Sequence, residues 1–300
     1  MKTNFVDIRQ RTRLHRSPLG NAKGFTMAEL LVVVLISSFV LTAVLSLFVM
    51  NARTQESQER IGEIQQNLRA GLEVLAADIR TAGYDPTGNA GAGIVNATPD
   101  LLYFTRDIAG ATAADPPDGA LTSTGEHVAY DNYLSTAGNI QTLGRVAAST
   151  APVITVTAGH YEATGHEPAA SHVEALGFAY AFDNDNDGEI DTSAAGNIIW
   201  AVDKDNDGLL ETGLDINTAG VDDGFIDTDD VQGGVALGYT VPLARIRAVR
   251  IWMLARAANT SENYSNTRTY VVGARWVTPS GDGFERRVRS EIVGCRNMGL

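Results

Sequence analysis

Two acidic segments in the second half of the chain have the residue types and the spacing of a calcium-binding loop. The first runs from Asp183 to Asp191 with the pattern D-x-D-x-D-G-x-x-D. The second runs from Asp203 to Glu211 and repeats this pattern with glutamate in the last place. Calcium takes roughly six to eight oxygen ligands, and carboxylates at alternate positions around a glycine turn can converge on one ion. We therefore predict a calcium site in each segment.

The expected ligands are carboxylate oxygens, plus one backbone carbonyl from the residue that follows the glycine. They are Asp183, Asp185, Asp187, Glu189 and Asp191 in the first loop, and Asp203, Asp205, Asp207, Leu209 and Glu211 in the second. Neither loop is an EF-hand, because Ala194 and Leu214 occupy the twelfth positions, where a bidentate glutamate is expected. The loops resemble the nine-residue aspartate-rich calcium loops of extracellular repeat proteins. A third, degenerate copy is predicted from Asp223 to Asp227.

The charge around these loops also favours a bound cation. Residues 183–230 contain 15 acidic residues and one base, Lys204. So much negative charge strains a compact fold unless counter-ions are present. The alternatives are a solvated acidic loop and a magnesium site, although flexible carboxylates favour the larger calcium ion. His160 and His166, with glutamates nearby, form a looser candidate set for zinc, but isolated loop histidines are more often only polar.

A third candidate is Glu29, the one charged residue in an otherwise uncharged run of 26 residues from Phe25 to Met50. A helix of about 20 apolar residues spans a bilayer, so this run is long enough. An ionisable side chain inside the membrane is costly and is by default a functional residue, unless it reaches the headgroups. The first 24 residues contain six bases and one acid, which predicts that they stay cytoplasmic.

Residues 16–50 resemble the N-terminal signal of type IV pilins and pseudopilins. The resemblance rests on Lys23-Gly24-Phe25-Thr26-Met27-Ala28-Glu29 and the apolar run behind it. It implies that a prepilin peptidase cleaves after Gly24 and methylates the new N-terminal residue, Phe25. It also implies that Glu29 neutralises the N-terminal amine of a neighbouring subunit during assembly. Opposite charges attract strongly in a medium of low dielectric constant, which suits this role.

The helix and strand patterns of the sequence predict an α+β fold, with one long helix packed on a mainly antiparallel sheet. Beyond the membrane segment, apolar residues recur at helical spacing, which predicts a face that docks on a globular head. Gly83 and Pro86 are expected to end this helix. The predicted divisions are a removed leader (1–24), a helix (25–82, with 25–50 in the membrane) and a β-rich head (83–300). The apolar face consists of Ile61, Ile64, Leu68, Leu72, Leu75 and Ile79.

Short apolar runs separated by turn residues predict the strands of the head. They are residues 101–105, 127–133, 153–157, 173–182, 246–255, 268–277 and 284–293. The last part of the chain, from Arg245 onward, has ten arginines and four acids. Alternation along the strands predicts that these arginines face solvent and protect an exposed sheet edge. The signal, the segment Asp78–Tyr84, the acidic loops and the arginine strands together resemble the PilW-type minor pilins.

Composition excludes several other classes of protein. A net charge of −13 argues against a nucleic-acid partner, although the arginine strands leave a DNA-binding surface as a minor alternative. Cys295 is the one cysteine, which excludes an internal disulfide and a thiolate zinc site. No catalytic set with motif support is present, so we do not expect an enzyme. A signal-anchored binding module or enzyme outside the cytoplasm is a remaining alternative.

The resemblance implies a minor pilin of a type IV pilus that supports assembly, adhesion and motility. Its expected partners are other pilins through the helix, the prepilin peptidase and the assembly platform of the inner membrane. The chain is expected to cross the bacterial inner membrane once before assembly, and then to enter the pilus, in the periplasm and at the cell surface. The nearest alternative is a minor pseudopilin of a type II secretion system, which shares the signal and the helix.

Overall fold

The computed structural model describes residues 24–299, except residues 111, 113, 136–139, 158 and 263. The predicted leader therefore lies outside the described residues, apart from Gly24. The chain divides into two compact units, Met1–Gln55 and Glu56–Leu300, and helix α1 (Met27–Ile79) contributes to both. The units are described separately below.

Helix α1 begins two residues after the predicted start and ends three residues before the predicted end. Its 53 residues correspond to about 80 Å at 1.5 Å per residue. After Ile79 the chain turns, and Gly83 adopts a φ of +74°, which a residue with a side chain rarely takes. The helix thus ends slightly earlier than predicted, and Gly83 lies in the turn that follows it.

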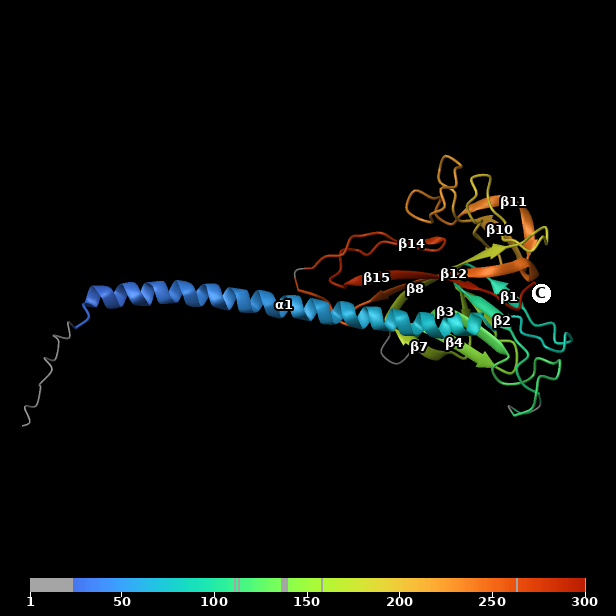
Figure 1. Cartoon of the computed structure of the whole chain (residues 1–300), viewed down its shortest axis with the longest axis horizontal. Coiled ribbons are helices and arrows are strands. Elements are labelled where there is room, and N and C mark those ends of the chain that lie inside the picture. The colour runs from blue at the N-terminus through green and yellow to red at the C-terminus, as the bar shows by residue number, and fades with distance from the viewer. Residues whose placement is uncertain are drawn as a thin grey trace, which may run out of the picture. The chain divides into compact units, whose positions relative to one another are not determined.

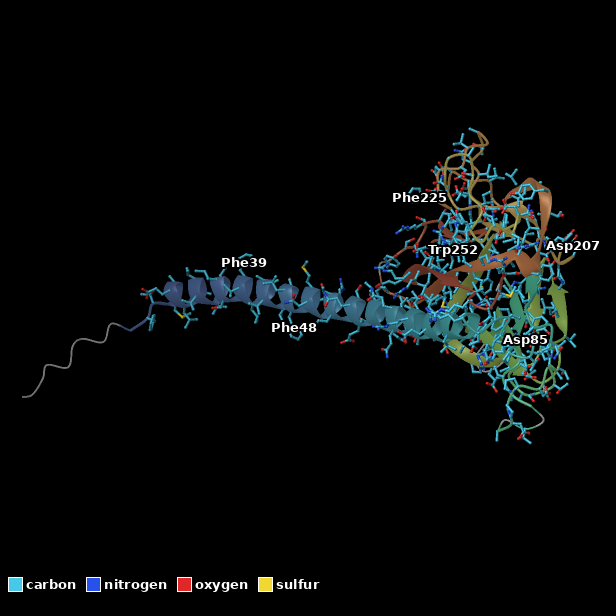
Figure 2. The ribbon with its side chains drawn as sticks, turned by 45° about the vertical axis from the view of Figure 1, so that its right-hand side comes forward. Phe39, Phe48, Asp85, Asp207, Phe225 and Trp252 are labelled. Atoms are coloured by element: carbon cyan, nitrogen blue, oxygen red, sulfur yellow. The ribbon has the colours of Figure 1, made fainter. Side chains whose placement is uncertain are left out.

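In the N-terminal unit, α1 exposes a continuous apolar surface. An 18-residue window has a mean hydropathy of 2.8, and the helix is long and apolar enough to cross a membrane. Phe39 is 71% exposed and Phe48 is 72% exposed, and Figure 2 shows both projecting from the helix. A surface of this kind is stable in hydrocarbon or against other apolar helices, but not in water.

In the C-terminal unit, α1 buries the apolar face that the periodicity predicts. Ile64, Leu68, Leu72, Leu75 and Ile79 are all buried, together with Gly71 and Ala76, whereas Ile61 is only half-buried. Gly71 allows close approach, because a side-chain carbon there would lie 3.2 Å from Ala170, Leu143 and Met253.

Two antiparallel sheets form most of the head within the described residues (Figure 1). The first has the order β1 (Ile94–Ala97), β2 (Leu102–Thr105), β3 (His127–Ser135), β4 (Ile140–Ala148), β7 (Glu167–Ser171). The second has the order β11 (Val235–Pro242), β10 (Leu209–Gly213), β9 (Ala201–Val202), β8 (Val173–Phe182), β12 (Ile246–Arg256), β15 (Arg286–Gly294). The helix and both sheets contribute to one buried apolar cluster, so the α+β prediction is confirmed.

Two small hairpins complete the strands. They are β5 (Ile154–Thr157) with β6 (His160–Ala163), and β13 (Tyr270–Val272) with β14 (Arg275–Val277). A single strand over residues 268–277 was therefore the wrong prediction, because Gly273 adopts a φ of +59° and the chain reverses there. A short 3-10 turn, Leu243–Arg245, leads into β12.

The expectation that the C-terminal arginines face solvent is wrong for Arg286, which is 1% exposed. Its guanidinium forms paired hydrogen bonds with Glu174 at 2.5 and 3.0 Å and with Asp282 at 2.5 and 2.7 Å. Two carboxylates thus neutralise and solvate the buried cation. Arg287 and Arg289, on the same edge strand, are exposed as predicted.

A second ionic cluster joins the end of α1 to the first sheet. Asp78 accepts hydrogen bonds from Arg106 at 3.1 Å, Arg145 at 2.8 Å and the Tyr130 hydroxyl at 2.6 Å. Although burial opposes the ionised form, the hydrogen bonds from Arg145 and Tyr130 and the charge of Arg106 hold the pKa of Asp78 below its ordinary value. The helix end is thereby fixed by side chains as well as by apolar packing.

Candidate calcium-binding loops and the start of the helix

Each predicted calcium loop begins where a buried strand of the second sheet ends. Strand β8 ends at Phe182 and β9 ends at Val202, and the next residue in each case is the first aspartate of a loop. These two aspartates are nearly inaccessible to solvent, since Asp183 is 1% exposed and Asp203 is 0% exposed. The aspartates in the middle of each loop are exposed, and Figure 2 shows Asp207 at the surface of the head.

The two loops have the same backbone conformation. The N–H groups of Asp187 and Gly188 donate to the Asp183 carboxylate at 3.1 and 3.2 Å. The N–H groups of Asp207 and Gly208 donate to Asp203 at 3.1 and 2.9 Å. The asparagine before each central aspartate has a positive φ, 63° at position 186 and 62° at position 206. The sequence repeat is therefore a structural repeat.

The carboxylates converge more completely in the second loop than in the first. Oxygen atoms of Asp203, Asp205, Asp207 and Glu211 all lie within 4.8 Å of one another. In the first loop this holds for Asp183, Asp185 and Asp187. Asp191 lies apart from this group, and its carboxylate accepts the Asn184 N–H at 3.4 Å.

For the two remaining predicted ligands, Glu189 and Leu209, the sequence predicts coordination through the backbone carbonyl. Their N–H groups donate to Asp187 at 2.8 Å and to Asp207 at 3.0 Å. The Glu189 side chain is exposed and lies outside the oxygen cluster. Coordination by either carbonyl stays a prediction.

Electrostatics in the loops favours a cation. Burial, together with neighbouring carboxylates, raises the pKa of Asp203, Glu211 and Asp191 above their ordinary values. Glu211 Oε2 is buried and has no hydrogen-bond partner within the described part of the chain. In the first loop, Arg247 Nη2 lies 3.3 Å from Asp183 Oδ2, so the guanidinium offsets part of the negative charge of the loop. The donor set, oxygen atoms alone, fits calcium.

The predicted third copy, from Asp223 to Asp227, does not form a cluster of its own. Asp223 contacts Asp215, whose carboxylate accepts the Asp223 N–H at 3.3 Å. Asp227 instead lies within 4.8 Å of Asp229 and Asp230. Burial, with the charges of Asp222, Asp230 and Asp223, raises the pKa of Asp215 to about 7. The motif did not predict Asp215, because Asp215 lies eight positions before Asp223, whereas the corresponding aspartates of the other loops lie four positions apart.

The first turn of α1 contains an arrangement that sequence reasoning also missed. The Glu29 carboxylate accepts hydrogen bonds from the Thr26 N–H and hydroxyl, and the Glu29 N–H donates to Thr26 Oγ1 at 3.2 Å. This is a capping box, which satisfies donors that a helix N-terminus leaves free. The signal T-x-x-E was present in the sequence.

The two histidines of the looser zinc set are engaged separately. His160 contacts Asp100 through Nδ1 at 2.5 Å and the Asn132 carbonyl through Nε2 at 2.9 Å. His166 contacts Asp131 at 2.7 Å and stacks on Tyr133, with ring centroids 4.2 Å apart. Each imidazole is thus held by its own carboxylate.

Comparisons with known proteins match both ends of the chain. Residues 19–45 match the family model of the prokaryotic N-terminal methylation motif. Residues 210–297, which span β11 to β15 and most of β10, match the model of the type IV pilus-assembly protein W, PilW. No curated protein sequence matches the chain. A type IV-like pilin from Thermus thermophilus is similar in structure, with a TM-score of 0.40 and 13% identity over 79% of this chain and 98% of that chain.

Proposed function

We propose that this chain, a PilW-like type IV pilin, is a minor subunit that enters the pilus through its N-terminal helix and supports pilus assembly. The observation that carries this proposal is the methylation motif at residues 19–45, which lies over the start of an exposed apolar helix. A leader peptidase and neighbouring pilins are the partners that such an N-terminus requires. The pilus-assembly family at residues 210–297 favours a pilus over a secretion pseudopilus.

The helix serves two successive roles in this proposal. Before assembly, residues 25–50 hold the subunit in the inner membrane as a single span, because their apolar side chains are stable in hydrocarbon. During assembly, the same side chains pack against the helices of other pilins. Glu29 then pairs with the N-terminal amine of a neighbouring subunit, because an unpaired charge in an apolar bundle is costly.

In the head, the loops 183–191 and 203–211 bind calcium. Four converging carboxylates in the second loop and three in the first support this role. So does the buried Glu211 Oε2, which lacks a hydrogen-bond partner among the described residues. The loops follow β8 and β9 directly, so a bound ion would stabilise the edge of the core from which they start. In this proposal, the surface through which the head adheres or contacts other subunits forms when calcium is bound.

Deletion of the gene in the native host tests the pilus role. Loss of surface pili and of twitching, with secreted proteins unchanged, supports the proposal. Loss of protein secretion with normal pili would assign the chain to a secretion pseudopilus instead. Immunodetection of the head in sheared pili, compared with the membrane fraction, provides the second readout.

Thermal unfolding of the full chain in detergent tests the calcium role. Ligand at a hundredfold excess over Kd stabilises the folded state by about 2.7 kcal/mol. Asp185→Asn together with Asp205→Asn should reduce the calcium-dependent rise in Tm. Glu189→Gln is the matched control, because it retains the backbone carbonyl and should leave the rise intact. An identical Tm in calcium and in chelator would exclude both loops as calcium sites and leave the pilin proposal standing.

A further inference from the structure

The segment 215–230 repeats the hydrogen bonds of the two calcium loops although its sequence spacing differs. The Asp223 N–H donates to Asp215 at 3.3 Å, as Asp187 does to Asp183 and Asp207 does to Asp203. The Phe225 N–H donates to Asp223 at 2.9 Å, as the residue after each glycine does in the other loops. Gly224 has a φ of +86°, close to the values at Gly188 and Gly208.

The segment differs from the other two loops at one oxygen atom. In those loops, the glycine N–H donates to the second oxygen of the first aspartate. Here the Gly224 N–H donates to Asp222 Oδ1 at 3.0 Å. Asp215 Oδ2 is therefore left without a hydrogen-bond partner among the described residues. Asp215 is only 5% exposed, and a buried carboxylate oxygen without a partner is costly.

A second buried carboxylate is held against the start of the same segment. Asp230 is 6% exposed. The bridge between Asn217 and Asp230, and the hydrogen bond from the Val231 N–H to the Ile216 carbonyl at 2.9 Å, fix its position. Asp230 Oδ2 accepts the Asp227 N–H at 2.8 Å, and the negative charge of Asp230 is near enough to raise the pKa of Asp215.

A basic side chain does not provide the missing partner. Burial lowers the pKa of Arg250 below its ordinary value, and the negative charge of Asp215 opposes this change. Its guanidinium lies over the rings of Trp252 at 4.7 Å and Trp200 at 5.7 Å. Among the described residues it forms no ion pair with Asp215. A cation held by oxygen atoms would satisfy Asp215 Oδ2 and offset the negative charges of Asp222, Asp230 and Asp223 around it.

We propose that Asp215, Asp223 and Asp230 form a third calcium site, in a loop of the same type that is four residues longer between Asp215 and Asp223 and three residues longer between Asp223 and Asp230. The proposal extends the calcium function proposed for the first two loops. These longer spacings explain why the nine-residue motif cannot be recognised in the sequence. This site would fix residues 215–230 against the second sheet.

Counting bound calcium tests the third site. The full chain in detergent is stripped with chelator and dialysed against calcium chloride, and the bound metal is measured per chain. Asp215→Asn should bind one calcium ion fewer than the wild type. Asp223→Asn should show the same loss. Because Asp223 is exposed, this variant separates loss of the site from a folding defect caused by replacing the buried Asp215. Glu262→Gln, at an exposed acid outside this segment, should bind as the wild type does.

A second variant separates this site from the first two loops. Asp185→Asn with Asp205→Asn should retain one calcium ion, which is lost when Asp215→Asn is added. If the double variant binds none while the wild type binds calcium, the third site is excluded and the two loops stand. Unchanged calcium content in Asp215→Asn, or an equal loss in the control Glu262→Gln, would also overturn the proposal. A wild-type chain that binds no calcium overturns it together with the two loops.

Discussion

The Glu29 carboxylate accepts hydrogen bonds from both the N–H and the hydroxyl of Thr26, at 2.9 and 3.0 Å. The carboxylate thus has partners within its own chain, and its charge lies at the positive end of the helix dipole. In the proposed filament, the same carboxylate faces the amine of a neighbouring subunit. Thr26 would then hold Glu29 in position until the neighbour arrives.

Replacement of Thr26 tests this arrangement. Thr26→Ala removes the hydroxyl, and loss of an N-cap side chain costs about 1 kcal/mol. The amides of Glu29 and Leu30 should exchange with deuterium about fivefold faster in detergent micelles. Thr26→Ser retains the hydroxyl and should exchange as the wild type does. Equal protection in all three proteins would show that the capping box contributes nothing to the helix start.

Two substitutions of Glu29 separate its charge from its hydrogen bonds. Glu29→Gln keeps an acceptor for Thr26 but removes the charge, and Glu29→Ala removes both. If pairing with a neighbouring amine drives assembly, both variants should remain in the membrane fraction and be depleted in sheared pili. Quantitative immunoblots of the two fractions measure this. Normal incorporation of Glu29→Gln would reduce the residue to a helix cap.

The buried guanidinium of Arg286 should be essential for the stability of the head. Arg286→Met retains much of the volume but leaves Glu174 and Asp282 without their partner. Removal of one partner from a buried ion pair costs about 3 to 5 kcal/mol. Arg287→Met, at the next and exposed position, should change the free energy of unfolding by less than about 0.5 kcal/mol. Urea unfolding measures both, and equal effects would contradict the burial of Arg286.

Stability should depend on pH through His160. Both ring nitrogens contact acceptors, so the imidazole is protonated, and the hydrogen bond with Asp100 raises the pKa of His160 above its ordinary value. The stabilisation is complete below the unfolded-state pKa of about 6.5 and is lost as pH rises through the higher folded-state value. The Tm difference between wild type and His160→Gln should therefore shrink from pH 5.5 to 8.5. A constant difference would contradict an ion pair.

The sequence predicted the helix and its buried face because the apolar periodicity extends over several turns. It also located β8 and β12, whose apolar runs are long. It missed β1, β4, β6, β7, β9, β10 and β11, since these strands are short or their residues are mixed or exposed, and only pairing with neighbours makes them strands. Local alternation could not identify Arg286 as buried, because Glu174 lies 112 residues away in the chain.

The candidate sites show the same limit. The two regular calcium loops were predictable from spacing alone, since each is a local motif. Asp215 was not, because its longer spacing from Asp223 departs from the motif while the fold restores the contact. The role of Thr26 could have been predicted from the T-x-x-E pattern, which overlaps the processing signal.

The mature N-terminus tests the central claim most directly. Pili sheared from the native host are digested, and the N-terminal peptide of this chain is sequenced by mass spectrometry. If the chain is cleaved at the predicted junction, it begins at N-methylated Phe25. The variant Gly24→Leu should then remain as an uncut precursor in the membrane. A chain that begins at Met1, or downstream of Met50, would contradict its assignment as a processed pilin.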